Sequence, residues 1–328
     1  MASNKITLVI GELTDTGSLD SITGELIAAA SRITENIQCL LLGTGAKDAG
    51  QQAVQLGASK VHTSEDALLT NVNIDALVEA SHQATSQINP SVVLVGKTLI
   101  GRDLAPRLAF RFNVPLVQDC IDIEVDDNDR VIATRPVYGG NALAKLVCNK
   151  DPQVIAMRPK TLDPLPADSS RSGEVAEISL TLDADVQKVN QIERIIQEQE
   201  GEKLEEARIV VSVGRGIAGP ENLPAFESLA KTMGAALGAS RAVVDAGWLD
   251  HSYQVGLTGK SIAPELYLTW AISGASQHMA GCTNAKNIVA VNKDPDCNIF
   301  KESRFGVVGD WEKVLPGFTA MLSEMGIS

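Results

Sequence analysis

The sequence predicts an α/β protein of two domains, a mixed Rossmann-like sheet domain followed by a doubly wound domain with a parallel sheet. Over the first hundred residues, apolar runs such as ITLVI and SVVLVG alternate with helical patterns, which indicates βαβ units. The alternation resumes with ARIVVSVG in the last third of the chain. Apolar residues make up 44% of the chain and aromatic residues only 4%, which is typical of parallel sheets built from Val, Ile, Leu and Ala.

The first domain is predicted to start with alternating strands and helices. Strands are expected in the apolar runs that begin at Ile6 and Ile37 and in SVVLVG. Helical patterns cover residues 21–33, 46–56 and 101–110, and a long helix precedes SVVLVG. The runs DCIDIEV, RVIATRPV, NALAKLVC and QVIAMR then follow one another with turn residues between them, so they are expected to be antiparallel strands that complete this domain.

The domain boundary is expected near Gly201. A cluster of Pro, Asp and Ser ends the first pattern, and one more strand and the charged run IERIIQEQEGEKLEEA follow. The N-terminal domain therefore spans residues 1–200 and the second domain residues 201–328. The second domain opens with a strand, a glycine loop and a helix that Pro220 can begin. Its later strands are expected at residues 242–244, 266–271, 288–291 and 307–308.

Composition excludes several classes of partner. The net charge is -13 and the 28 Lys and Arg residues do not cluster, which argues against binding to nucleic acid or to an anionic membrane surface. No run of about 18 apolar residues occurs, so membrane insertion is not expected. The five cysteines lack C-x-x-C spacing and are interpreted as reduced packing residues. A cytoplasmic location is expected, or the mitochondrial matrix if the protein is eukaryotic.

The second domain carries a glycine loop and further polar loops that could line a nucleotide or flavin site. Gly214, Gly216 and Gly219 match G-x-G-x-x-G between a strand and a helix, which favours a pyrophosphate. The alternative is a tight turn that leaves Arg215 in a surface ion pair. A nicotinamide enzyme would also need an acid near the next strand, and Asp245 is the candidate.

The runs GASRAVVDAG, QVGLTGK and SGASQH add Ser, Arg, Gln, Thr and His at loop positions. TGKS does not complete a Walker loop, and the hydroxyl of Thr258 could equally cap a helix. A lone histidine such as His278 is often structural. No nucleophile elbow, metal-ligand cluster or carboxylate pair is apparent in the sequence. A donor-rich site without acid–base groups suits a protein that holds a redox cofactor.

Most of the chain resembles the alpha subunit of electron transfer flavoproteins. The motifs that carry the resemblance are VSVGRGIAGPENL, GAALGASRAVVDAGW, QVGLTGKSIAPELY, AISGASQHMAG, NIVAVNKDP and FGVVGDWEKVLPGF, with GRDLAPRLAFRFNVPLVQDCIDIE and RPVYGGNALAKLVC in the first domain. The resemblance implies one FAD on the second domain and a beta subunit that completes a heterodimer and carries AMP or a second FAD.

The resemblance also implies the residues of the FAD site. Arg215 would approach the dinucleotide, Arg241 would lie by the flavin, and His278 would lie near the C2 carbonyl of the ring. Leu257 departs from the family, which more often has Gln there, so one hydrogen bond toward the ribityl chain is missing. The implied set is Arg215, Ser240, Arg241, Gln254, Val255, Gly256, Leu257, Thr258, Ser273, Gly274, Ala275, Ser276, Gln277, His278, Asn292, Asp310 and Trp311.

The resemblance implies an electron carrier. It would accept electrons from flavin dehydrogenases such as the acyl-CoA dehydrogenases of fatty acid oxidation and pass them to a quinone-linked oxidoreductase or another acceptor. A cation at Arg241 and a donor at His278 would stabilise negative charge on the reduced flavin, and each contact would shift its potential by roughly 60 to 130 mV. The alternatives are a subunit of an electron-bifurcating NADH-dependent flavoprotein and an NAD-dependent oxidoreductase.

Overall fold

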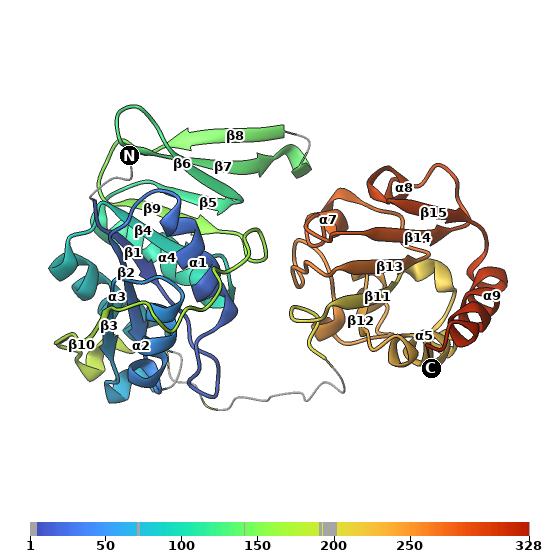
Figure 1. Ribbon diagram of the computed structural model, residues 1–328, viewed down its shortest axis with the longest axis horizontal. Helices are drawn as coiled ribbons and strands as arrows, with labels where there is room; N and C mark the ends of the chain where they lie inside the picture. The colour runs from blue at the N-terminus through green and yellow to red at the C-terminus, as the bar shows by residue number, and fades with distance from the viewer. Residues whose placement is uncertain (1–4, 71–72, 141, 190–191, 193–201, 328) are drawn as a thin grey trace. The chain divides into compact units, whose positions relative to one another are not determined.

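The computed structural model describes residues 5–70, 73–140, 142–189, 192 and 202–327 of the chain. The chain divides into two compact α/β units, Met1–Ile195 and Ile196–Ser328, which are described separately below (Figure 1). The expected boundary between residues 200 and 201 lies outside the described residues. The predicted fold class, two α/β domains with parallel sheets, is confirmed.

The N-terminal unit is built on a seven-stranded sheet in which every pair of neighbours is parallel. The strand order is β10-β3-β2-β1-β4-β9-β5, so the chain moves outward from β1 to β3 and then returns to the other side of β1 with β4. Its strands are β1 (Thr7–Ile10), β2 (Ile37–Leu42), β3 (Lys60–Ser64), β4 (Val92–Gly96), β5 (Leu116–Cys120), β9 (Gln153–Met157) and β10 (Glu174–Glu177). The sequence analysis missed β3 and most of β5, whose runs KVHTS and LVQDC are only partly apolar.

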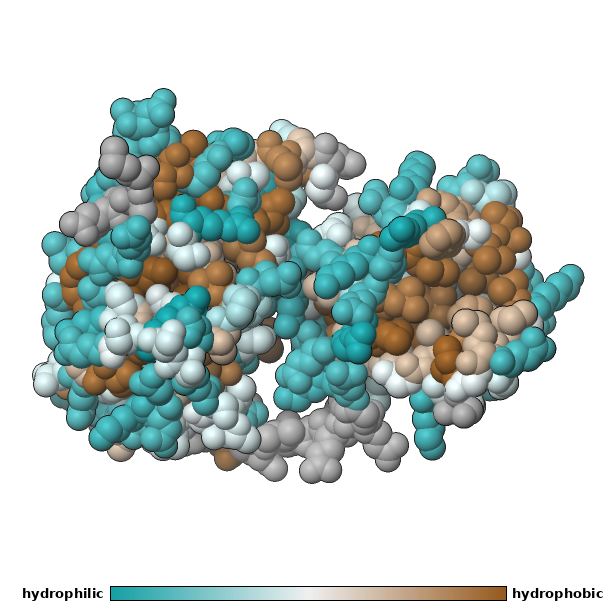
Figure 2. All heavy atoms as spheres, in the orientation of Figure 1, coloured by the Kyte–Doolittle hydropathy of each residue, from teal (hydrophilic) through white to brown (hydrophobic). Residues whose placement is uncertain are grey.

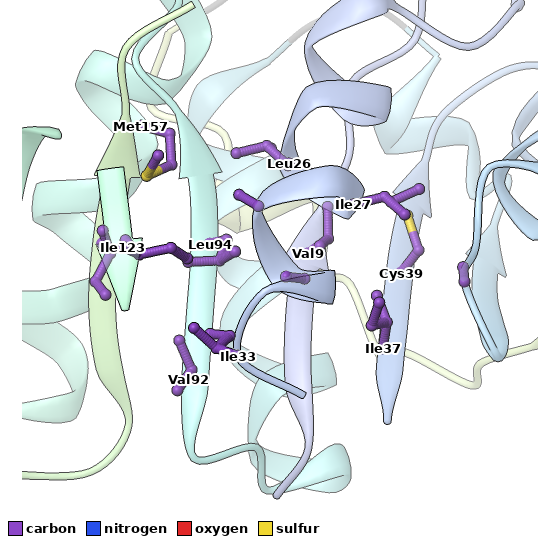
Figure 3. Close-up of a cluster of buried hydrophobic side chains, with 14 of the residues drawn as sticks. Val9, Leu26, Ile27, Ile33, Ile37, Cys39, Val92, Leu94, Ile123 and Met157 are labelled. Carbon is purple, nitrogen blue, oxygen red and sulfur yellow. The ribbon is translucent and has the colours of Figure 1, made fainter. Parts of the chain in front are cut away.

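Helices cover both faces of this sheet. Along β1 and β4, alternate residues face opposite sides, and Val9 and Leu94 pack with the helices α1 (Ser21–Ser31) and α2 (Ala46–Gln55) in the cluster drawn in Figure 3. Val93 packs on the other face with α3 (Ile74–Ile88) and α4 (Leu99–Phe112). Because both faces are covered, the central strands β1, β4 and β9 are apolar at nearly every position.

One strand differs from the prediction. The run QVIAMR was expected to be antiparallel, but β9 lies between β4 and β5 and pairs with both in parallel. All five of its residues are buried, which a strand achieves only in the middle of a sheet covered on both faces. The other three runs supply an antiparallel sheet of β6 (Asp122–Val125), β7 (Val131–Val137) and β8 (Ala142–Val147), although the first two residues of DCIDIEV end the parallel strand β5.

The C-terminal unit contains a five-stranded parallel sheet in the order β12-β11-β13-β14-β15. One face packs on Phe226 and Leu315, and the other on Met279 and Ile299. The strands are β11 (Ile209–Val213), β12 (Ala236–Ala239), β13 (Leu266–Trp270), β14 (Ile288–Asn292) and β15 (Phe305–Val308), and the helices are α5 (Leu223–Thr232), α6 (Arg241–Asp245), α7 (Ser276–Met279), α8 (Ile299–Glu302) and α9 (Trp311–Glu324).

The strand expected at residues 242–244 is wrong, because these residues belong to the short helix α6. The strand of this segment is β12, whose sequence ALGA has little β-forming character. Its small residues are required by close packing, since a Cβ atom on Gly238 would lie 2.3 Å from the Oγ atom of Ser212 on β11. Local β propensity therefore predicted a strand at Val243 and Val244, whereas close packing places the strand at the preceding small residues of β12.

The surface of the C-terminal unit includes an exposed sheet edge. β15 is the edge strand, and its Phe305, Val307 and Val308 side chains are all exposed. Figure 2 shows apolar surface on this unit. None of the helices that the structure describes combines the length and the apolar character needed to cross a bilayer.

A buried group of charges fastens three strands of the N-terminal sheet at their carboxyl ends. Asp119 of β5 accepts hydrogen bonds from Nε and Nη2 of Arg158 at 2.9 and 2.8 Å, and Nζ of Lys97 lies 2.7 Å from Asp119 Oδ1. Burial by itself would raise the pKa of Asp119, but the hydrogen bonds and charges of Arg158 and Lys97 outweigh it and hold the pKa below its usual value. The carboxylate is thus an anchor for β4, β5 and β9.

Replacing Asp119→Asn is expected to destabilise the N-terminal unit by about 3 kcal/mol, because it leaves two cations without their buried counter-charge. The stabilisation by ionised Asp119 is fully present above the pKa of this group in the unfolded chain, about 4. It is lost as the pH falls through the lower pKa of Asp119 in the folded protein. Urea unfolding followed by far-UV circular dichroism measures the change. The three tryptophans, Trp248, Trp270 and Trp311, all belong to the C-terminal unit, so the fluorescence transition should stay unchanged.

The matched control is Asp122→Asn, which makes the same chemical change in an ion pair with Arg32 whose two side chains are each 50% exposed. That pair should contribute at most about 0.5 kcal/mol. Equal losses in the two variants would show that Asp119 is not a special anchor.

Candidate functional site

Most of the expected site residues follow the carboxyl ends of the parallel strands in the C-terminal unit. Arg215 follows β11, Ser240 follows β12, Ser273 follows β13, Asn292 is the last residue of β14, and Asp310 follows β15. Because neighbouring strands are parallel, their carboxyl ends lie at the same edge of the sheet, and the loops that follow them are gathered there. That edge is the candidate site.

The loop from Gln254 to Lys260 is fastened to this edge. The backbone N–H of Val255 donates to the carbonyl of Ala239 at 2.9 Å, and Gln254 forms an isolated parallel bridge with Ala239, the last residue of β12. Gln254 is buried, and its Nε2 donates to Oγ1 of the exposed Thr258 at 2.9 Å. The side chain of Gln254 therefore shapes the turn, and the O–H of Thr258 keeps a proton that it can donate elsewhere.

Two of the polar loops lie against each other. The N–H of Leu257 donates to the carbonyl of Gln277 at 2.7 Å, and that of Ile262 donates to the carbonyl of Gly281 at 2.7 Å. Gly256 has φ 142°, and a Cβ atom on Gly281 would lie only 2.5 Å from the Cα of Gly256. These glycines let the runs QVGLTGK and SGASQHMAG meet. Gly274 is buried, while Ser273, Ala275, Ser276 and Gln277 are exposed.

The glycine loop after β11 is explained largely by packing. A Cβ atom on Gly214 would lie 2.1 Å from the carbonyl oxygen of Ala271, and one on Gly216 would lie 2.9 Å from the Cβ of Ala271. The loop itself contains a 3-10 turn at Arg215–Ile217, and a second one at Pro220–Asn222 separates it from α5, so the glycines do not lead directly into an α-helix as expected. Arg215 is exposed and makes no ion pair with any residue that the structure describes.

Arg241 is an exposed cation at the start of α6. Its side chain is 67% exposed, and its Nε atom lies 3.2 Å from Oδ2 of Asp245 one turn later. A pair this exposed is weak and leaves most of the guanidinium available. Asp245 lies in the helix and not at the end of a strand, so it lacks the position of an acid that holds a nicotinamide ribose.

His278 is a buried polar residue of the site, as are Gln254 and Asn292. Its Nε2 atom and the hydroxyl of Tyr267 are 2.8 Å apart, and its Nδ1 atom has no hydrogen-bond partner among the described residues. Burial lowers the pKa of His278 to about 4, and the hydrogen-bonding backbone of Val255 near the ring opposes part of this shift. The imidazole is therefore neutral at pH 7 and carries one N–H.

The hydrogen bond with Tyr267 determines which ring nitrogen of His278 carries the proton. Burial raises the pKa of Tyr267 well above its ordinary value, so its hydroxyl keeps its proton. If that proton is donated to Nε2, the imidazole N–H is on Nδ1, the atom without a partner. A buried donor without a partner fits a polar ligand such as a flavin carbonyl. The sequence analysis missed Tyr267, although the hydroxyl of a tyrosine in a buried strand usually has a hydrogen-bond partner.

Three expected residues have clear structural contacts. Asn292 donates from Nδ2 to the carbonyl of Ile272 at 2.9 Å and accepts the N–H of Asp294 at 3.0 Å. Asp310 caps α9, and the ring of Trp311 lies 5.3 Å from that of Phe226. These contacts account for Asn292, Asp310 and Trp311 without a ligand.

The comparisons with known proteins cover both units. Residues 7–183 match the family model of the electron transfer flavoprotein domain, and residues 203–283 match that of the electron transfer flavoprotein FAD-binding domain. Electron transfer flavoprotein subunit alpha of Thermoanaerobacterium thermosaccharolyticum is 38% identical over 309 residues, 92% of each protein. The Bacillus subtilis subunit alpha is 38% identical over 326 residues, 98% of this chain and 99% of that protein.

A relative of a different description also aligns along most of the chain. Subunit LctC of the lactate dehydrogenase (NAD(+),ferredoxin) of Acetobacterium woodii is 31% identical over 311 residues, which are 93% of this chain and 74% of that subunit. With two family models matched in order and curated relatives aligned almost end to end, the chain belongs to the alpha-subunit family of electron transfer flavoproteins, and its C-terminal unit contains that family's FAD-binding domain.

Proposed function

We propose that this chain holds one FAD at the carboxyl edge of its C-terminal sheet, pairs with a beta subunit, and carries single electrons between other flavoproteins. The observation that carries the proposal is the neutral, buried His278, whose Nδ1 atom lacks a partner beside loops rich in hydrogen-bond donors. The site offers donors and cations without an acid–base pair, which suits binding and tuning of a cofactor.

Different residues of the site bind different parts of the cofactor. Arg215 and Arg241 supply exposed positive charge for the phosphates and the flavin ring, and Thr258 supplies a hydroxyl donor. His278 donates from a buried position at which a hydrogen bond is stronger than in water. Bound FAD supplies the ability to take up and release one electron at a time.

The partners follow from the same proposal. The donors are flavin dehydrogenases, with acyl-CoA dehydrogenases of fatty acid oxidation as the expected class, and the acceptor is a quinone-linked oxidoreductase. The beta subunit carries AMP or a second FAD. The exposed edge of β15, with Phe305, Val307 and Val308, supports the need for a partner protein, because proteins rarely leave an apolar sheet edge uncovered.

A second candidate is a subunit of an electron-bifurcating flavoprotein. The relative from Acetobacterium woodii is named for both NAD(+) and ferredoxin, which favours this alternative. The hydride from NADH would then enter through the partner subunit. The two candidates are separated by assaying NADH oxidation by the purified heterodimer with ferredoxin and a high-potential electron acceptor both present. A carrier should show none, whereas sustained oxidation that requires both acceptors would establish bifurcation.

Replacing Arg241→Ala is expected to lower the reduction potential of bound FAD by about 60 mV, because a positive charge that favours the reduced ring is removed. The value is taken at the low end because the guanidinium is largely exposed and solvent screens it. A redox titration of the FAD-loaded heterodimer, followed by flavin absorbance, measures the shift.

Two further variants control this experiment. Arg241→Lys keeps the charge and should retain most of the potential, while Asp245→Asn removes the opposing carboxylate and should raise it slightly. An unchanged titration curve for Arg241→Ala would refute the assigned role of Arg241.

The chain alone is expected to bind FAD weakly. Leu257, Thr258 and the run from Ser273 to Gln277 are mostly exposed, whereas a ligand site buries most of its ligand. A second protein surface must therefore cover the ring. Fluorescence titration of FAD with the chain alone and with its beta subunit tests this; tight, complete loading of the isolated chain would contradict it.

A further inference from the structure

A cavity lies in the N-terminal unit, and none of the residues assigned to the FAD site lines it. Its volume is about 210 Å³, and it is lined by residues at the carboxyl ends of β1 and β2 and by residues of α3 and α4. It opens where the strand order reverses, between β1 and β4, which is the usual ligand position in doubly wound sheets. At about 30 Å³ per water molecule, it has room for about seven waters or a compact organic molecule.

Glu12 is held rigidly in the wall of this cavity. Its Oε1 atom accepts a hydrogen bond from Oγ1 of Thr98 at 2.6 Å, and Thr98 is itself fixed as the N-cap of α4. The backbone N–H of Glu12 donates to Oγ1 of Thr23 at 2.8 Å, and that hydroxyl donates back to the Glu12 carbonyl at 3.0 Å. Its Oε2 atom makes no hydrogen bond with the described residues.

A second polar group in the cavity wall also lacks a partner. Ser81 of α3 is completely buried, and its Oγ atom has no hydrogen-bond partner in the described part of the chain. Buried hydroxyls are almost always hydrogen-bonded, so an unpaired one beside a cavity indicates a polar occupant. The rest of the wall includes the apolar side chains of Leu42, Leu77 and Leu104.

The charge of the wall restricts the occupant. Glu12 and Asp15 both line the cavity, and no Lys or Arg does so among the described residues. Burial raises the pKa of Glu12 to about 7, with Asp20 adding to the shift and the Thr98 hydrogen bond opposing it. A neighbouring positive charge would therefore stabilise the ionised carboxylate of Glu12, whereas a phosphate or carboxylate would be repelled.

We propose that this cavity binds a small organic cation, an amidine or a primary ammonium on a compact apolar body. The positive group hydrogen-bonds to Glu12, and the apolar body packs against Leu42, Leu77 and Leu104. The inference does not depend on FAD, because the site belongs to the other unit of the chain.

Benzamidine is a suitable probe, with benzamide and benzoate as matched neutral and anionic molecules of the same shape. Benzamidine should bind the full chain with a Kd of about 1 mM or tighter, at least about tenfold more tightly than benzamide, and benzoate should not bind measurably. Ligand-observed NMR at pH 7.5 measures all three. Absence of benzamidine binding, or equal binding of benzoate, overturns the proposal.

The variant that identifies the site is Glu12→Gln, which can still accept the Thr98 hydrogen bond but loses the charge. It should weaken benzamidine binding about tenfold or more. The control is Glu25→Gln in α1, another buried carboxyl whose pKa burial raises to about 7, but which pairs with Lys160 and does not line the cavity. Binding that survives Glu12→Gln, or is lost equally in Glu25→Gln, shows that benzamidine binds elsewhere.

Discussion

The parallel pairing of strands is the constraint on which the rest of this structure depends. Every neighbouring pair in the seven-stranded and five-stranded sheets is parallel, so each sheet has one edge at which all its strands end. Loops that are distant in the sequence therefore meet at that edge. In the C-terminal unit this brings together the loops of the proposed FAD site, and in the N-terminal unit it produces the cavity at the reversal between β1 and β4.

Close backbone contact then gives these loops their shape. Gly214 lies against the carbonyl of Ala271, and Gly256 lies against Gly281, so a Cβ atom at Gly214 or Gly281 would force the backbones apart. Close packing therefore explains the glycines of this loop without any need for a bound phosphate. The polar side chains gain fixed positions because the backbones that carry them cannot separate.

Burial has three different electrostatic outcomes in this chain. Asp119 is buried with two cations and its pKa falls, while Glu12 is half-buried in the cavity wall without a neighbouring cation and its pKa rises to about 7. His278 is buried without an anion, and its pKa falls to about 4. Desolvation always favours the neutral form of such a group. The neighbouring charges therefore decide whether the group stabilises the fold through an ion pair or remains available to bind a ligand.

The sequence by itself determined the α/β class, most helices and strands and the antiparallel group of β6, β7 and β8, because these depend on local periodicity and turn residues. It also identified the polar loops of the C-terminal half. Only the tertiary structure decided that β9 lies inside the parallel sheet and that residues 242–244 are helical, since burial and close approach overrode local propensity. The Tyr267–His278 pair and the cavity at Glu12 likewise join residues far apart in the chain or on different elements, and no sequence pattern records such contacts.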